Sequence, residues 1–441
     1  MVSNRIFVFF LIAMFFGPYF PGTPFRVDQI IGWAYICAFG MYFVKGVRFG
    51  SATEKKIMTL SLIILIIAFC RIWIDFTHFR FSFQFTNQYS YFAVGACIYY
   101  FHKKRLRSGR EMFVRGLLCA SIIINAYAMV QSSSPGSPYV QTVADWYGGD
   151  KKIEGGLEAF GSISHLVIAA GRVTSIFNII QAYAIFNLII IALALGARRD
   201  INLARKDKIL ALAALIFAIV GGVLSVSKVF ILGGGIMFLI LGIFLMSNKA
   251  IKELALILLT GFLFGAVFVY VAEQNRVLSG ILDLVVSGDI MRVFLSRFGG
   301  GGEVGYLDES MAITFELQTL LYGLGVFAGE HHYSDFGYRQ ILILGGLPLF
   351  ILFYGLVIYI LMLNWRNRKI SPYAMTFFAL GVALLAAEIG IACHIQGRVI
   401  PIWMLLNLVV CFPRDLLPRG IKEFEQVHSG EHTIQLGDKS A

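Results

Sequence analysis

Long apolar runs alternate with short polar connections along almost the whole 441-residue chain. Several runs approach or exceed the roughly 20 residues that a helix needs to cross a bilayer. The ten-residue alternating segments typical of an outer-membrane β-barrel are absent. The pattern therefore predicts an all-α, polytopic integral membrane helix bundle with about twelve transmembrane helices, at residues 6–20, 29–46, 57–74, 86–101, 116–131, 176–197, 209–224, 229–247, 254–272, 340–363, 374–392 and 399–412.

The connections between these runs alternate in charge. Every second connection is basic, as in "HKKRLRSGREMFVR" (102–115) and "RRDINLARKDK" (198–208), and the others are neutral or acidic. Most of the 37 lysines and arginines lie in the basic set and near the two termini. Cytoplasmic loops carry the excess of basic residues, so we expect both termini to be cytoplasmic and the protein to be a multi-pass component of a bacterial inner membrane.

The composition supports a bilayer as the surrounding solvent. The chain is 58% hydrophobic and 14% charged, whereas a soluble protein carries about 25% charged residues. The mean hydropathy is +0.76. In a soluble protein the net charge of +11 would suggest nucleic acid as a partner. Here the positive-inside bias explains it, and we expect no nucleic-acid partner.

The chain has no soluble-domain boundary. We expect one transmembrane helical domain (1–424) that includes two long non-cytoplasmic loops, at 132–175 and 273–339, and a mobile cytoplasmic tail (425–441). The second loop contains "ILDLVVSGDIMRVFLSRF" (281–298). Its apolar positions fit a helix on the membrane surface or one packed against the rest of the loop, and the sequence leaves both open.

The pattern of cysteines and the lack of a phosphate-binding loop motif both argue against a bound cofactor. The six cysteines show no CxxC pair and lie mostly in apolar runs, which is typical of small buried side chains. The first apolar run lacks a small-residue cleavage site and reads as a retained span. The glycine-rich "FGGGGEVG" (298–305) lacks the Lys-Ser/Thr ending of a nucleotide-binding loop. We expect no cofactor and no metal site.

Arginines on the non-cytoplasmic side are the first chemical signal. The topology disfavours them there, so each needs a reason, either a loop ion pair, a lipid headgroup or a ligand. Taken together they favour an anionic ligand, because a guanidinium matches phosphate oxygens with two hydrogen bonds and keeps its charge at low dielectric. These arginines are Arg172, Arg276, Arg292, Arg297, Arg339 and Arg398.

The second signal is a titratable cluster ahead of the span at 340–363. His331, His332 and Asp335 lie within one helical turn of each other and suit general acid–base work. Two further residues keep two interpretations each. Lys228 is a candidate cation or a side chain that reaches to the interface. Glu388, inside a predicted span, is functional or paired with a residue near the same membrane face, Arg398 or His394.

The order of these elements resembles the O-antigen polymerase and O-antigen ligase superfamily of bacterial cell-envelope glycan assembly. The similar stretches are "GRVTSIFN" (171–178) and "LYGLGVFAGEHHYSDFGYRQILILGGLP" (321–348). The resemblance implies a GT-C-like helix bundle with a large periplasmic loop. It also implies an inverting, metal-independent glycosyltransferase that uses undecaprenyl-pyrophosphate-linked oligosaccharide, with a chain-length regulator and a flippase as partners.

Carried onto this chain, the resemblance assigns roles to the residues above. Arg172 with Arg292 and Arg297 would bind the pyrophosphate, with Arg339 and Arg398 as further ligands. His332 or Asp335, with His331 beside them, would act on the acceptor hydroxyl. The chain departs from the Arg-x10-Gly pattern of some polymerases, because Tyr183 and Glu303 stand at the glycine positions.

Three functions stay open from the sequence. The first is polymerisation of lipid-linked repeat units, which the "HHYSDFGY" stretch (331–338) favours. The second is ligation of finished glycan to lipid A core or another acceptor. The third is transport of lipid-linked sugars, which would place charges deep in the spans. Since most non-cytoplasmic charges lie at the span edges, an enzyme is favoured over a transporter.

Overall fold

The described part of the chain is helical. The computed structural model describes residues 3–19, 26–46, 49–74, 87–148, 172–177, 179–247, 251–274, 279, 317–323, 337–388 and 393–412. Within these ranges there are 14 α-helices and no named strand. They are α1 (Asn4–Phe15), α2 (Val27–Val44), α3 (Ala52–Ile74), α5 (Ser90–Ser108), α6 (Arg110–Ser133), α7 (Pro138–Gly148), α9 (Ile180–Arg199), α10 (Arg205–Leu224), α11 (Lys228–Ser247), α12 (Ile251–Gln274), α16 (Leu317–Tyr322), α18 (Gly337–Asn367), α19 (Ala374–Ala387) and α20 (Val399–Leu406).

The all-helical fold class is confirmed, whereas the expected number of spans is not. Each of the twelve predicted segments overlaps a helix, and α20 continues as a π-helix (Asn407–Cys411). Six described helices are long and apolar enough to cross a bilayer by length and composition: α2, α6, α9, α10, α11 and α18. Four further apolar stretches are only 10–17 residues long. The described residues thus support a multi-pass membrane protein with six long spans rather than twelve.

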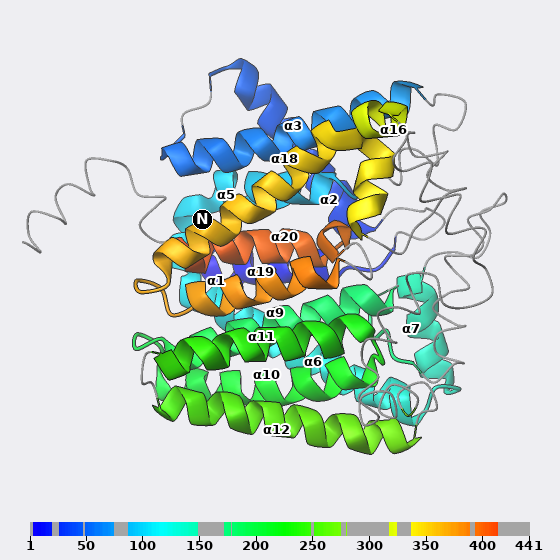
Figure 1. The fold of residues 1–441 in the computed structure, drawn as a ribbon, viewed down its shortest axis with the longest axis vertical. Coiled ribbons are helices and arrows are strands. Elements are labelled where there is room, and N and C mark those ends of the chain that lie inside the picture. Colours follow the sequence, from blue (N-terminus) through cyan, green and yellow to red (C-terminus); the bar gives the residue numbers. More distant parts are fainter. Residues whose placement is uncertain are drawn as a thin grey trace, which may run out of the picture.

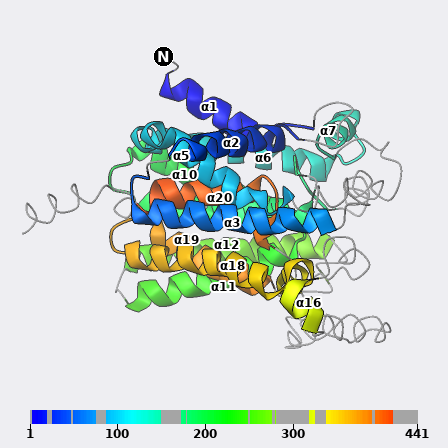
Figure 2. The same ribbon diagram turned by 90° about the horizontal axis from the view of Figure 1, so that it is seen from above.

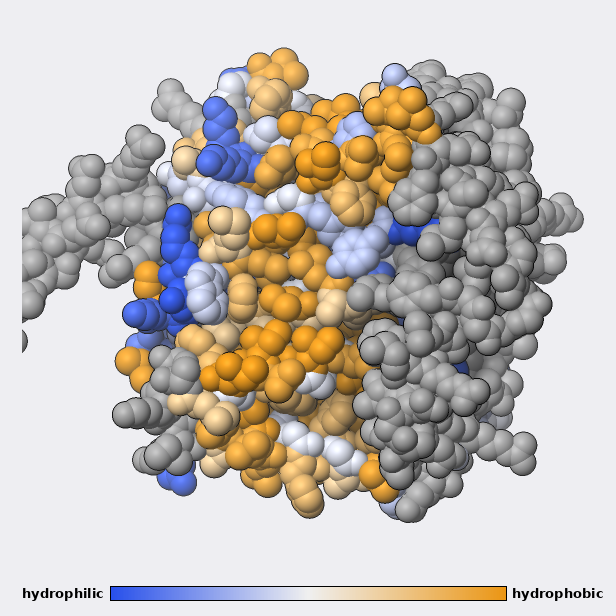
Figure 3. All heavy atoms as spheres, in the orientation of Figure 1, coloured by the Kyte–Doolittle hydropathy of each residue, from blue (hydrophilic) through white to orange (hydrophobic). Residues whose placement is uncertain are grey.

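The helices lie side by side (Figures 1 and 2). Hydrophilic side chains gather along the left edge in Figure 3, beside a broad apolar surface. At this basic end, ion pairs join the helix termini. Lys103 Nζ lies 3.0 Å from Glu54 Oε1, and Arg115 Nη2 lies 2.7 Å from Asp207 Oδ2. The connections predicted to be cytoplasmic therefore lie together at one end.

Large apolar side chains cover the outside of the bundle. Phe9 and Phe10 on α1 and Phe262 on α12 are each more than 60% exposed. In water such a surface would promote association, but in a bilayer it meets lipid tails at no cost. These exposed apolar side chains are consistent with helices that face lipid.

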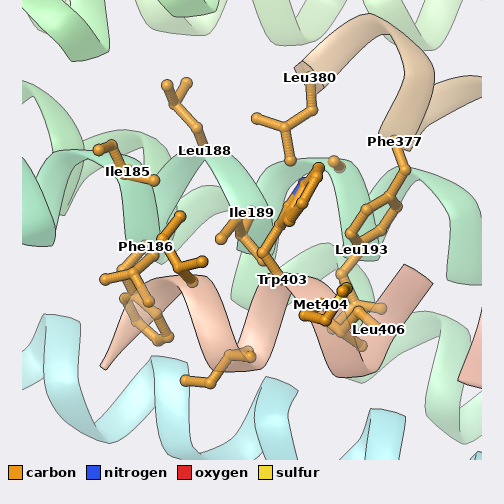
Figure 4. Packing of buried hydrophobic residues seen from close by; sticks show 14 of the residues in the cluster. Ile185, Phe186, Leu188, Ile189, Leu193, Phe377, Leu380, Trp403, Met404 and Leu406 are labelled. Carbon is orange, nitrogen blue, oxygen red and sulfur yellow. The ribbon is translucent and has the colours of Figure 1, made fainter. Parts of the chain in front are cut away.

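Helix α9 is the centre of the bundle. Its residues are apolar around the whole circumference, which is typical of a helix enclosed by others. Of its most apolar 18-residue stretch, 94% is buried inside the bundle. Figure 4 shows Ile189 and Leu193 of α9 packed between α19 and α20, with Trp403 and Phe377 contributing large rings. Helix α9 also packs against α6, α10 and α11.

A break in α18 lies near the end opposite the basic connections. Gly346 has φ 67° and ψ −171°, and Pro348 follows two residues later. A Cβ on Gly346 would come within 2.9 Å of main-chain atoms of Leu320 and Gly323, so α16 meets the break backbone to backbone. The "GGLP" sequence is explained by this contact, because a side chain at position 346 would meet both a positive φ and the neighbouring main chain.

Close helix packing predicts that alanine substitutions at two glycines have different effects on stability. A Cβ on Gly222 of α10 would lie 2.1 Å from the buried ring of Phe230, which stacks on Phe264. Gly222→Ala should therefore lower stability by about 1–3 kcal/mol. Gly235→Ala on α11 is the matched control, because nothing lies within 4 Å of its new Cβ. Thermal unfolding in detergent should show a lower midpoint for Gly222→Ala alone, and equal midpoints would contradict this packing.

Candidate functional site

Polar side chains of the described residues gather at the end of the bundle opposite the basic connections. They come from the end of α1, the start of α2, the segment 172–177, the start of α18, the end of α19 and the residues before α20. By the charge pattern of the sequence this is the non-cytoplasmic end. Helix α7 lies at this same end (Figure 1).

Arg398 connects four of these elements. It precedes α20 in a left-handed conformation (φ 65°), and its side chain is 1% exposed. Nη1 donates to the Ile176 carbonyl (2.5 Å) and Nη2 to the Gly17 carbonyl (3.1 Å). The guanidinium also lies over the Tyr147 ring of α7, 5.2 Å from its centroid. Arg398 thus holds α1, α7 and the segment 172–177 against the start of α20.

Asp28 is the carboxylate of this cluster and serves two arginines. Arg26 grips it with two hydrogen bonds, Nε to Oδ1 (2.9 Å) and Nη2 to Oδ2 (3.1 Å). Arg398 Nε lies 3.8 Å from Oδ1. Arg26 Nη2 also reaches the Tyr91 hydroxyl at 3.3 Å. Two guanidinium groups and one carboxylate leave this buried group with one formal positive charge.

The shared carboxylate affects the two arginines differently. Burial alone would lower the pKa of Arg26, but Asp28 and two neighbouring tyrosines offset this, and the pKa is raised well above its usual value. At Arg398, burial and the nearby Arg26 charge lower the pKa, and Asp28 offsets this only in part. Arg398 therefore depends on main-chain carbonyls, whose dipoles satisfy its donors without supplying a counter-charge.

The segment that carries Arg172 is fixed from both sides. The Ser175 main-chain N–H donates to Gln131 Oε1 (2.8 Å), and Ser175 Oγ donates to the Ile124 carbonyl (2.8 Å), both on α6. Ser175 has a positive φ of 52°. Its neighbour Ile176 accepts from Arg398. Arg172 itself is partly buried, and no hydrogen bond or ion pair joins it to another described residue.

A second polar group lies at the end of α19. Glu388 is fully buried and accepts from the His394 main-chain N–H (2.9 Å), from His394 Nδ1 (2.8 Å) and from the Tyr354 hydroxyl (3.2 Å). The Gly337 main-chain N–H donates to the Glu388 carbonyl (2.8 Å). This bond places the start of α18, and with it the buried Arg339, beside the Glu388–His394 pair.

The structure thus joins several residues that the sequence singled out. Arg398 contacts the segment of Arg172, His394 lies four residues before Arg398, and Gly337, two residues before Arg339, bonds to Glu388. The partner of Glu388 is His394 rather than Arg398. Other predicted residues lie outside the described ranges, and their roles stay predictions: Arg276, Arg292, Arg297, His331, His332 and Asp335, with the tail 425–441.

Arg26 and Asp28 are site residues that the sequence analysis missed. The available signal was "FRVD" (25–28), an arginine and an aspartate at the non-cytoplasmic start of a span. Lys228 is the first residue of α11, and the charge pattern of the sequence places it on the same, non-cytoplasmic side. Within the ranges that the structure describes, no group of three or more histidine, cysteine or acidic side chains could hold a metal ion.

Comparison with known proteins found no relatives. No protein-family model, no curated protein and no solved structure matches this chain.

Asp28 should be essential for the integrity of this end of the bundle. Asp28→Asn leaves two buried guanidinium groups without their carboxylate, and removing one partner of a buried ion pair costs about 3–5 kcal/mol. Glu111→Gln, at an exposed position on α6, is the control. We expect a clear drop in the thermal unfolding midpoint for Asp28→Asn and none for Glu111→Gln. Equal midpoints would show that Asp28 does not support the fold.

Proposed function

We propose that this chain is an integral membrane glycosyltransferase that polymerises undecaprenyl-pyrophosphate-linked oligosaccharide repeat units at the periplasmic face of the inner membrane. The reaction is inverting and metal-independent, as the family resemblance implies. In this proposal the protein crosses the membrane several times, with the six long apolar helices as its spans, and both termini are cytoplasmic. The gathering of basic helix termini at one end supports this orientation.

One observation carries the proposal: arginines and a net positive cluster meet at the end of the bundle opposite the basic connections. Arg26 and Arg398 share Asp28, and Arg398 fixes the segment that bears Arg172. A lipid-anchored donor keeps its pyrophosphate at the interface on this side. Preorganised positive charge there would stabilise the leaving pyrophosphate, and such stabilisation is often the largest catalytic contribution.

We assign different tasks to the arginines. Arg172, partly exposed, and Arg339, at the start of α18, are the described residues that we expect to bind the pyrophosphate, together with Arg292 and Arg297. Arg398 was predicted as a further phosphate ligand, a role that stays untested. Because its guanidinium already donates to two main-chain carbonyls, we propose that it holds the Arg172 segment in place. His332 or Asp335, with His331 beside them, stay candidates for the base.

Two other functions differ in their products. A ligase of the same superfamily would transfer glycan to lipid A core or another acceptor, and a transporter of lipid-linked sugars would form no bond. Glu388 is an ionisable group at the end of a span, as in a transporter. However, it is paired with His394 at the non-cytoplasmic end, and this position favours an enzyme.

Purified protein in detergent or nanodiscs, incubated with undecaprenyl-pyrophosphate-linked oligosaccharide, should convert it to a ladder of longer lipid-linked chains. The ladder is read by gel electrophoresis and mass spectrometry. Product that appears only when lipid A core is added would indicate a ligase instead. Unchanged donor under all conditions, with folded protein, would refute both transferase functions and favour transport.

Arg172 tests the role of the positively charged end. Arg172→Ala should lower polymer formation by at least about 100-fold, since one lost charge-stabilising contact costs roughly 2.7–4 kcal/mol in catalysis. Arg205→Ala is the control, because Arg205 is an exposed arginine at the basic end of the bundle. Both variants should retain the wild-type unfolding midpoint. Full-length polymer from Arg172→Ala would rule out this arginine as a pyrophosphate ligand.

A further inference from the structure

The surroundings of the Glu388–His394 pair contain polar groups that lack partners. His394 Nε2, Trp403 Nε1 and the Tyr89 hydroxyl are all buried and have no hydrogen-bond partner among the described residues. The three side chains are each 2% exposed or less. An unsatisfied buried polar group costs about 1–3 kcal/mol, and such groups in native proteins call for an explanation. Three of them around one buried carboxylate indicate a place built to receive a polar group.

The pair has a defined hydrogen-bonding pattern. Glu388 Oε1 accepts from both the main-chain N–H and Nδ1 of His394, and Tyr354 holds the other carboxylate oxygen. With Nδ1 donating to the carboxylate, the neutral imidazole carries its free lone pair on Nε2. A carboxylate that orients an imidazole in this way is the arrangement by which histidine acts as a general base.

Trp403 completes the pattern. Its ring lies edge to face with the His394 ring, with centroids 5.6 Å apart. Its Nε1–H can only donate, whereas His394 Nε2 in this tautomer can only accept. A hydroxyl group is the simplest chemical group that can both accept from a donor such as Trp403 Nε1 and donate to an acceptor such as His394 Nε2. Water and a sugar hydroxyl share this property.

We propose that His394, oriented by Glu388, is the general base that activates the acceptor sugar hydroxyl. This inference rests on the proposed glycosyl transfer. A bond forms between the acceptor oxygen and the anomeric carbon of the donor sugar. The bond from that carbon to the pyrophosphate oxygen breaks, and its electron pair leaves with the undecaprenyl pyrophosphate. The hydroxyl proton passes to His394 Nε2 and is released to solvent after the product departs.

The full burial of the pair is part of the proposal. In this proposal the acceptor reaches the pair from the end of the bundle at which the Gly337 main-chain N–H donates to the Glu388 carbonyl. A closed site keeps bulk water away from the base, and water would otherwise hydrolyse the lipid-linked donor. The position also fits the chain topology, because α18 begins where the loop carrying His332 and Asp335 ends.

The test compares kinetics of purified full-length variants in the polymerisation assay. His394→Gln keeps a polar side chain of similar length but cannot accept the proton, so kcat should fall about 100- to 10,000-fold. Trp403→Phe removes one hydrogen-bond donor and should lower kcat while the unfolding midpoint and donor KM stay unchanged. His102→Gln is the matched control, since His102 lies on α5 and bonds to the Tyr35 hydroxyl.

The outcomes separate the two proposals. Polymer from wild-type protein, with kcat lost in His394→Gln and donor KM and unfolding midpoint retained, supports the base assignment. Polymer from both wild type and His394→Gln at equal kcat overturns the base assignment and leaves the glycosyl transfer intact.

A loss of folding or donor binding in His394→Gln, together with full kcat in Trp403→Phe, assigns the Glu388–His394 pair a structural role and also overturns the base assignment. A larger kcat loss in His332→Gln or Asp335→Asn than in His394→Gln moves the base to that residue. If wild-type protein makes no polymer, the proposed function itself falls, and this inference with it.

Discussion

Asp28 is shared by two arginines, and the end of the bundle opposite the basic connections depends on this interaction. A guanidinium group cannot be left unpaired inside an apolar bundle, because removing an ion from water costs several kcal/mol even after relaxation. Arg26 takes both oxygens of Asp28. Arg398 is left with the carbonyls of Gly17 and Ile176 and the Tyr147 ring. Satisfying one buried charge therefore fixes the ends of α1 and α20, α7 and the Arg172 segment together.

In the proposed function, the same constraint favours this end of the bundle over the other as the place of glycosyl transfer. At the basic end, some cations pair one to one with carboxylates, as at Arg115–Asp207 and Lys103–Glu54, and others such as Arg205 are exposed to solvent. At the opposite end, two arginines share one carboxylate, and Arg172 has no described ion-pair partner. In the proposed function, buried positive charge in excess of its carboxylate would stabilise an anionic leaving group. Glu388, in contrast, is bound by histidine and tyrosine donors and does not neutralise these arginines.

The sequence predicts the helices well because their signal is local. Continuous apolar runs and alternating charged connections located twelve of the helical segments, and α18 differs from its predicted 340–363 only by added turns at each end. Helices α7 and α16 lie within the two stretches that were predicted as long loops. The break at Gly346 depends on the contact with α16 and has no local signature beyond "GGLP". The count of long spans was overestimated, because apolar stretches such as Asn4–Phe15 and Ala374–Ala387 are helical but shorter than a full span.

The site was predicted only in part because its contacts join distant residues. Arg172, Arg339 and Arg398 were found because the predicted topology places them on the side where arginines are disfavoured. Arg26 and Asp28 join the site only through the tertiary contact of Asp28 with Arg398, which lies far away in the chain. That Glu388 pairs with His394 and not with Arg398 likewise depends on the tertiary structure.

The most direct measurement of the central claim is a cryo-electron-microscopy structure with bound undecaprenyl-pyrophosphate oligosaccharide. We expect phosphate density beside Arg172 and Arg339, with the sugar directed toward His394. Phosphate density at the basic end, near Arg115 and Lys103, would contradict it.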